Sequence, residues 1–263
     1  MLTYADLKSD LLGLGLTGKP VIAHASLKSF GWIEGGATTL LYALLDTTAA
    51  LIMPTFTYKT MITPEVGPPN NGLTYGAEGD LNRMAEPFTM ELPADPSMGI
   101  VPETLRQFQN ARRTAHPIQS FAGVRADAAL AAQITDDHLA PIGALAGQGG
   151  WALLLGVDHT VNTSIHYAEK LAGRKQFVRW ALLPDRIIEC PGFPGDSSGF
   201  SSIALDVEKD TRFVRVGNAL VQAMPLDRLF AAVIDRIEQD PQALLCQRVD
   251  CERCNAVKES VSV

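Results

Sequence analysis

The stretch PVIAHASLKSFGWIEGGATTLLYALLDTTAALIMPTF, residues 20–56, sets the fold class of this chain. It begins with a short apolar run led by Pro20, as expected for a buried strand over 20–26. Residues 35–46 then have the length and apolar content of a helix that begins with glycine, and a second buried strand follows at 50–56. Strand, helix and strand in this order predict a parallel βαβ unit.

The alternation continues along the chain and predicts an α/β fold with a central, largely parallel sheet flanked by helices. A β-hairpin is expected at 175–189, with Pro184 and Asp185 at its turn. No repeat or linker divides the sequence, so we expect one domain over 1–263. The other expected helices are 3–16, 99–110, 126–134, 141–149 and a last one at 225–240, with further strands at 120–125 and 151–157.

Residues 57–98 interrupt this pattern with many prolines, glycines and asparagines. A long irregular stretch inside a compact domain usually has a function or is mobile. We interpret it as a loop that covers the substrate, although a variable surface insertion explains the same composition. Its acidic side chains would suit a cationic substrate, and they are Glu65, Glu78, Asp80, Glu86, Glu91 and Asp95.

Composition and charge limit the class of protein. The chain has 263 residues, 46% hydrophobic and 19% charged, which is typical of globular proteins. A formal net charge of −7 argues against non-specific nucleic-acid binding, which needs a basic surface. The sequence has no apolar run of about 18 residues and no signal-peptide pattern at its start. We therefore expect a cytoplasmic protein with a small-molecule partner and no membrane association, with a homodimer as an open possibility.

The segment HASLKSFG, residues 24–31, lies between the first strand and the following helix. Open α/β sheets bind ligands at the carboxyl ends of their strands. The hydroxyl groups of this segment, Lys28 and the backbone N–H groups can hold a phosphate or a pantetheine chain. The alternative is a plain turn from strand to helix.

A histidine and a carboxylate follow the strand at 151–157. In NTSIHYAE, residues 162–169, Asn162 or Thr163 can cap a helix. His166 then lies near the positive end of the helix dipole, which favours the neutral imidazole that a general base needs. Glu169, three residues later, reaches the same face and favours the cation instead. The alternative is a buried histidine with a purely structural role.

Two further segments contain candidate site residues. In ARRTAHP, residues 111–117, the arginines can pair with phosphates, although adjacent arginines are also common on solvated surfaces. In CPGFPGDSSGF, residues 190–200, Asp196 can orient His166 as a carboxylate does in a triad, unless it only caps a glycine-rich turn. The acid that holds His166 is therefore either Asp196 or Glu169.

Four cysteines form the last candidate group. The tail CQRVDCERCN within 240–263 contains a C-x-x-C pair, which is half of many zinc sites. A four-ligand site formed by Cys190, Cys246, Cys251 and Cys254 requires the fold to bring Cys190 to the tail. We expect ordinary buried thiols rather than a bound metal.

Four segments, taken in order, resemble the aminoglycoside 3-N-acetyltransferase family. They are HASLKSFGWIEGGATTLLYALL at 24–45, MGIVPETLRQFQNARRTAHPIQSFAGVR at 98–125, LLLGVDHTVNTSIHYAE at 153–169 and GDSSGF at 195–200. Known members transfer an acetyl group from acetyl-CoA to the 3-amine of an aminoglycoside, an antibiotic-resistance activity, and have an α/β fold.

The resemblance implies a role for each candidate. The family's CoA-contacting loop falls on His24, Ser26, Leu27, Lys28 and Ser29, and its phosphate-contacting arginines fall on Arg112 and Arg113. His166 matches the family's catalytic histidine, and His116 matches a common but not universal one. The run Asp196–Gly199 is closer to the Asp-Ser-Asn-Gly variant of the family than to its Cys-Ser-Glu-Gly variant.

The resemblance implies acetyl transfer from acetyl-CoA to an amine, with His166 taking the proton. No cysteine lies in a context that indicates an acyl-enzyme, so we expect direct transfer. Backbone N–H groups near 26–29 would stabilise the oxyanion. Two alternatives remain open. One is an acyltransferase of the same fold that acts on a different amine, and the other is a non-catalytic scaffold that binds CoA or is stabilised by zinc.

Overall fold

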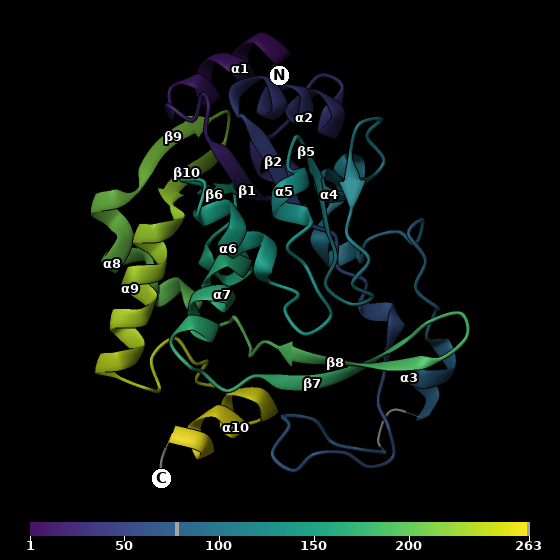
Figure 1. Cartoon of the computed structure of the whole chain (residues 1–263). Helices are drawn as coiled ribbons and strands as arrows, with labels where there is room; N and C mark the ends of the chain where they lie inside the picture. The colour runs from purple at the N-terminus through teal and green to yellow at the C-terminus, as the bar shows by residue number, and fades with distance from the viewer. Residues whose placement is uncertain (77–78, 262–263) are drawn as a thin grey trace.

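The computed structural model describes residues 1–76 and 79–261, and a seven-stranded sheet forms its centre (Figure 1). The strand order is β4-β5-β2-β1-β6-β10-β9. The strands are β1 (Pro20–Ala25), β2 (Ala50–Pro54), β4 (Arg112–Arg113), β5 (Phe121–Val124), β6 (Trp151–Leu155), β9 (Arg212–Val216) and β10 (Ala219–Pro225).

The three central strands of this sheet are parallel. Val21 of β1 pairs with Leu51 of β2 on one side and with Trp151 of β6 on the other. The outer pairings, β2 with β5 and β6 with β10, are antiparallel. β10 follows β9 through the two residues between Val216 and Ala219, and so short a connection permits only antiparallel pairing. The predicted α/β class is confirmed, with a mixed sheet whose parallel part is its core.

Helices cover both faces of the sheet, because successive strand residues point to opposite faces. Val21 and Ala23 belong to a core shared with α1 (Tyr4–Leu12), α2 (Gly36–Thr47) and α4 (Ile100–Arg106). Ile22 belongs to a second core on the other face. The helices on that face are α5 (Asp127–Leu130), α6 (Ala140–Ala146), α7 (Thr163–Leu171), α8 (Ala204–Val207) and α9 (Leu226–Gln239).

A second, three-stranded sheet has the order β3-β7-β8. β7 (Phe177–Leu182) and β8 (Ile187–Phe193) form the hairpin expected at 175–189, and β3 (Met61–Ile62) pairs with β7. Figure 1 shows this sheet and α10 (Glu252–Val261) at the end of the molecule opposite α1. The expectation that the helix at 225–240 is the last one is wrong, because the cysteine-bearing tail folds into α10. Its short, mostly polar sequence carries little apolar periodicity to reveal a helix.

The stretch 57–98 is mostly irregular, as expected. It contains β3, the short helix α3 (Gly79–Met84) and two single 3-10 turns. Its backbone follows the small sheet, since Phe88 N–H donates to Leu182 O at 2.9 Å. Within residues 1–76 and 79–261, no helix has the length and hydropathy needed to cross a membrane.

Candidate active site

A cavity of about 1090 Å³ opens at the carboxyl ends of the parallel strands. His24 at the end of β1, Pro54 at the end of β2 and Val157 after β6 line it from the main sheet. Phe193 at the end of β8 lines it from the small sheet. The cavity therefore lies between the two sheets, at the edge where open α/β sheets bind ligands.

His166 lies on the wall of this cavity and is held by a buried ion pair. Asn162 caps α7 by accepting a hydrogen bond from Ser164 N, which places His166 in the first turn of the helix. His166 Nδ1 lies 2.8 Å from Glu169 Oε2, and Glu169 Oε1 accepts from Arg174 Nη1 at 2.8 Å. The side chains of Glu169 and Arg174 are each only 2% exposed.

This chain of contacts fixes the orientation of the ring. A carboxylate at Nδ1 favours the tautomer with the ring proton on that nitrogen, which leaves Nε2 unprotonated. The ring is also packed edge-on against Phe200, with 4.7 Å between the centroids. Glu169 is therefore the acid that orients His166. Local helix spacing, three residues along one face, is sufficient to form the pair.

Asp196 lines the cavity, but its carboxylate oxygens bind Ser198, Arg248 and Arg253. Oδ1 accepts from Ser198 N at 2.9 Å, and Oδ2 accepts from Arg248 at 3.1 Å and from Arg253 at 3.4 Å. Burial raises the pKa of Asp196, but the hydrogen bonds from Ser198 and the two arginine charges outweigh it and leave the pKa below its ordinary value. The alternative in which Asp196 orients His166 is contradicted by these contacts.

The segment after β1 supplies one edge of the cavity. His24, Ser26, Leu27 and Lys28 line it. His24 is 5% exposed and its Nε2 has no hydrogen-bond partner within the described part of the chain. Burial lowers the pKa of His24 to about 3, so the ring is neutral. A buried polar atom without a protein partner is unusual, and here it lies beside the space where a ligand fits.

Ser29 differs from its neighbours in this segment. Its hydroxyl donates to Ser26 O at 2.7 Å and packs against Gly156, and Ser29 is not among the residues lining the cavity. The expected contact between Ser29 and a cofactor is therefore wrong, because the turn uses this hydroxyl to close itself.

The two adjacent arginines also lie outside the cavity. Arg112 is exposed and pairs with Asp127 at 2.8 Å. Arg113 points inward, where its guanidinium donates to the backbone oxygens of Thr55, Met90 and Leu92. Burial lowers the pKa of Arg113 to about 10. The predicted phosphate contacts are contradicted, because one side chain is on the outer surface and the other braces the chain after β2.

His116 is a structural residue. It is 5% exposed and its Nδ1 accepts hydrogen bonds from Ile118 N at 3.2 Å and from Gln119 N at 2.9 Å. Burial lowers its pKa to about 4, and the ring is not among the cavity-lining groups. The prediction of His116 as a second catalytic candidate is wrong, because its basic nitrogen already holds the backbone turn that follows Pro117.

Of the described residues in the long stretch 57–98, those lining the cavity lie at its two ends, Tyr58 and residues 96–98. The expected acidic lining is wrong where the structure describes it. Glu86 pairs with Lys59, Asp80 pairs with Arg83, and Asp95 caps the turn that follows it. Glu65 and Glu91 are also absent from the lining, and Glu78 lies outside the described residues. The charged groups in the lining are Lys28, Asp196 and Arg253.

Three features of the site were missed in the sequence. Gly35 and Gly36 line the cavity at the start of α2, with no side-chain cap on the helix, and Trp32 stands beside them with 73% exposure. The glycine pair before a helix was a usable signal for an anion site. Arg253 lines the opposite wall, and no local pattern marks it, because its partner Asp196 is 57 residues away.

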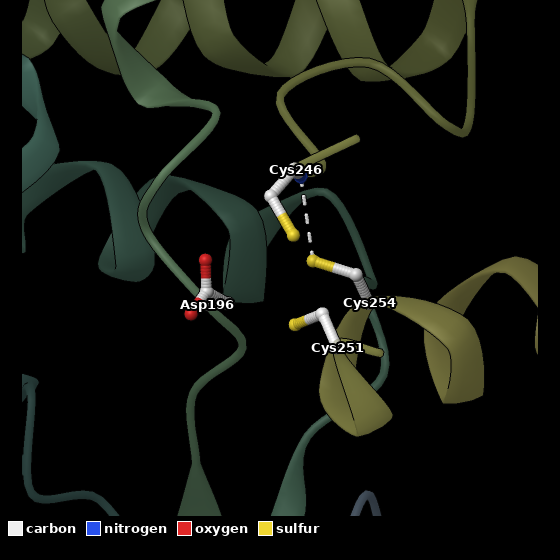
Figure 2. Close-up of side chains that lie close together, drawn as sticks. All are labelled: Asp196, Cys246, Cys251 and Cys254. Atoms are coloured by element: carbon white, nitrogen blue, oxygen red, sulfur yellow. Dashed lines mark hydrogen bonds between the residues drawn. The ribbon is translucent and has the colours of Figure 1, made fainter. Parts of the chain in front are cut away.

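The cysteines divide into a cluster and an outlier (Figure 2). Cys246, Cys251 and Cys254 lie together with Asp196, and their ligand atoms are all within 4.8 Å of one another. Cys190 lies in β8 and is not a member of this group. Burial raises the pKa of the Cys190 thiol to about 12. The fold therefore does not bring together the four cysteines that were considered as a possible zinc site, because Asp196 and not Cys190 lies with the tail cysteines.

A family model described as aminoglycoside 3-N-acetyltransferase matches residues 22–238. The chain belongs to this family. Aminoglycoside N(3)-acetyltransferase III of Serratia marcescens is 31% identical over 235 residues, which cover 78% of this chain and 84% of that enzyme. The predicted enzyme class is confirmed.

Two solved structures extend the comparison to the fold of the 3-N-acetyltransferase family. The aminoglycoside acetyltransferase AAC(3)-IVa superposes with a TM-score of 0.78 at 24% identity, over 98% of each chain. A binary complex of AAC-IIIb with CoASH superposes with a TM-score of 0.73 at 23% identity, over 90% of this chain and 97% of the other. The fold of this chain is thus that of these solved acetyltransferases.

Proposed function

We propose that this chain transfers the acetyl group of acetyl-CoA directly to the 3-amine of an aminoglycoside, with His166 as the general base. The observation that carries the proposal is the buried Glu169 carboxylate, which bridges His166 Nδ1 and Arg174 at 2.8 Å each, while His166 lines the cavity. In a catalytic triad, a histidine oriented by a carboxylate takes the proton of a hydroxyl nucleophile, and here the nucleophile would be an amine.

The chemistry needs one proton to move. An ammonium group has no lone pair, so the acceptor must lose a proton to His166 Nε2 before or during its attack on the thioester carbonyl. Glu169 holds the ring and stabilises the imidazolium that forms. Arg174 donates to the other oxygen of Glu169 and so fixes the position of this carboxylate. The proton on His166 is then available to the departing thiolate.

Acetyl-CoA supplies the acetyl group as an activated thioester. The residues that would hold it are His24, Ser26, Leu27 and Lys28, together with the start of α2. Three observations support this fit: the unpartnered Nε2 of His24, the uncapped N-terminus of α2 at Gly35 and Gly36, and a cavity volume above that of most single-ligand sites. The AAC-IIIb complex holds CoASH, which is the same ligand class.

The oxyanion would lie near the 3-10 turn Leu27–Phe30. Ser26 precedes this turn without capping it through its side chain, so the first N–H groups of the turn are available to a ligand. Donors fixed in this way before the reaction starts stabilise the developing negative charge.

The acceptor has two candidates. Family relatives act on aminoglycosides, and AAC(3)-IVa has been solved with a gentamicin and with apramycin. Among the described residues, however, the lining of this cavity contains one carboxylate, Asp196, against the two cations Lys28 and Arg253. That balance favours an amine with fewer positive charges, so a monoamine or an amino sugar is the second candidate acceptor.

A thiol-release assay with acetyl-CoA separates these possibilities. The panel consists of aminoglycosides of decreasing amine number, followed by single-amine sugars. Turnover with a 3-amine aminoglycoside supports the main proposal, and turnover only with monoamines supports the second. CoA binding without turnover on any amine would indicate a non-catalytic scaffold.

Replacing His166 by alanine tests the base. We expect kcat to fall by about 10²-fold or more while the Kd for CoA stays within about twofold, because the base acts in the chemical step and not in donor binding. Retention of more than about a tenth of kcat would contradict the assignment, since a general base contributes at least about 10²-fold.

A further inference from the structure

Three thiols and one carboxylate converge beside the cavity (Figure 2). Cys246 lies in the segment between α9 and α10, Cys251 directly precedes α10, and Cys254 lies in its first turn. Asp196 comes from the segment after β8. All four residues are buried, with exposures of 0 to 8%. Neither the acetyl-transfer mechanism nor the cavity uses the thiols.

We infer that Cys246, Cys251, Cys254 and Asp196 bind one zinc ion as a structural site. Zinc prefers four ligands in a tetrahedron, and thiolates with a carboxylate are within its ligand range. The metal would join the C-terminal helix to the segment that lines the cavity. The inference does not rest on the proposed acetyl transfer.

The geometry fits a closed tetrahedral site. With Zn–S bonds of about 2.3 Å, the edges of the tetrahedron are about 3.8 Å long. The ligand atoms already lie within 4.8 Å of one another, so small side-chain rotations complete the polyhedron. Binding converts three thiols to thiolates, and the three protons pass to solvent.

The surroundings balance the charge of such a site. Three thiolates and a carboxylate carry four negative charges and zinc carries two positive charges, which leaves two negative charges. Arg248 and Arg253 both donate to Asp196 Oδ2, so two positive charges next to the cluster balance the two negative charges. The backbone N–H of Cys246 donates to Cys254 Sγ at 3.4 Å, a type of contact that supports a thiolate ligand.

The metal would hold α10 in place, because the helix itself buries few side chains. It has ten residues, and only Cys254, Ala256 and Val257 are buried. A helix of this length is marginal in water unless tertiary contacts hold it. Two of the ligands, Cys251 and Cys254, lie at its start, so the metal would fix the end of the helix that carries Arg253.

Arg253 connects the metal cluster to the active site. It lies next to Cys254, donates to Gly195 O at 3.0 Å and lines the cavity. A metal that fixes α10 would therefore also fix one of the two cations of the substrate cavity. Loss of the metal should displace this side chain while His166 and Glu169, on α7, stay in place.

Elemental analysis of the full chain, purified without chelator, tests the site. We expect about one zinc per chain, and replacement by Co²⁺ should give the intense thiolate-to-metal absorption and visible bands of a tetrahedral cobalt site. Cys251→Ser should reduce the metal content to below about a tenth of the wild-type value. Asp196→Asn should keep the thiolate absorption but weaken Zn²⁺ affinity by at least about tenfold.

Cys190→Ala is the matched control, because Cys190 is equally buried and close in the fold but outside the cluster. It should keep the full metal content. A protein that stays metal-free after incubation with Zn²⁺, or that carries a disulfide between cluster cysteines as isolated, would overturn the inference. Equal metal content in wild type and Cys251→Ser would overturn it as well.

A measurement on the wild-type chain covers the case in which cysteine variants fail to fold. Zn²⁺-loaded protein should protect three thiols from a thiol-modifying reagent, and a chelator should expose them. Chelation should also lower Tm by at least about 4 °C, because metal binding contributes to folding. Equal modification of loaded and chelated protein would exclude the site.

Discussion

Replacing Glu169 by glutamine removes one negative charge and changes few atoms, so it isolates what that charge does. The carboxylate receives Arg174 Nη1 at 2.8 Å and holds His166 Nδ1 at 2.8 Å, with both ion-pair side chains 2% exposed. Two charge-assisted hydrogen bonds at about 1.5–3 kcal/mol each amount to about 3–6 kcal/mol. Breaking a buried ion pair by neutralising one partner costs a similar amount, about 3–5 kcal/mol.

We therefore expect Glu169→Gln to lower the free energy of unfolding by about 3–5 kcal/mol. At about 2–4 °C per kcal/mol, Tm should fall by at least about 6 °C. The effect on catalysis is separate. Without the carboxylate the ring loses both its orientation and the stabilisation of its cation, and kcat should fall by about 10²- to 10⁴-fold.

The assay combines thermal unfolding with kcat measured well below Tm, where the variant is folded. Glu103→Gln is the matched control. Glu103 also pairs with an arginine three residues later on one helix, Arg106 at 2.7 Å, but this pair is more exposed and lies outside the cavity. It should cost about 1 kcal/mol or less and leave kcat unchanged. A folded Glu169→Gln enzyme with more than about a third of wild-type kcat would refute the orienting role, since the expected loss is about 10²-fold.

The remaining predictions concern cofactor binding and pH. Lys28→Ala should raise the KM for acetyl-CoA by about 3- to 10-fold, a moderate effect because an exposed phosphate contact is partly screened. Arg112→Ala should leave this KM unchanged, because the Arg112 side chain pairs with Asp127. A larger increase in KM for Arg112→Ala than for Lys28→Ala would contradict the cavity assignment. Burial lowers the pKa values of His24, His116 and His138 to about 3, 4 and 3 from an ordinary 6.5, so the unfolded chain binds protons that the folded chain does not. The contribution of these neutral histidines to the free energy of unfolding is then fully present above pH 6.5. It should fall as the pH drops towards 4, by up to about 1.4 kcal/mol per pH unit for each histidine. Urea unfolding at pH 7, 6 and 5 measures this change, and a free energy of unfolding that does not depend on pH would contradict it.

The features of this protein that depend on local spacing could be predicted from the sequence. Apolar runs of strand length separated by a helix predicted the βαβ core, because burial selects the same residue types wherever a central strand occurs. The pair His166 and Glu169 was also predictable, since residues three apart share one face of any helix. The position of the cavity followed from the rule that ligands bind at the carboxyl ends of parallel strands.

Which residues from distant segments meet became clear only in the folded chain. His166 had two possible acidic partners in the sequence, Asp196 and Glu169, and the fold placed Asp196 with the tail cysteines instead. Arg113 and the acidic side chains of 57–98 that the structure describes have the expected charges, but they lie outside the cavity lining. Helical and strand periodicity fixes which neighbours a residue has within a few positions. Contacts across 50 or more residues, such as Arg248 with Asp196, depend on how whole elements pack, and no local pattern records that.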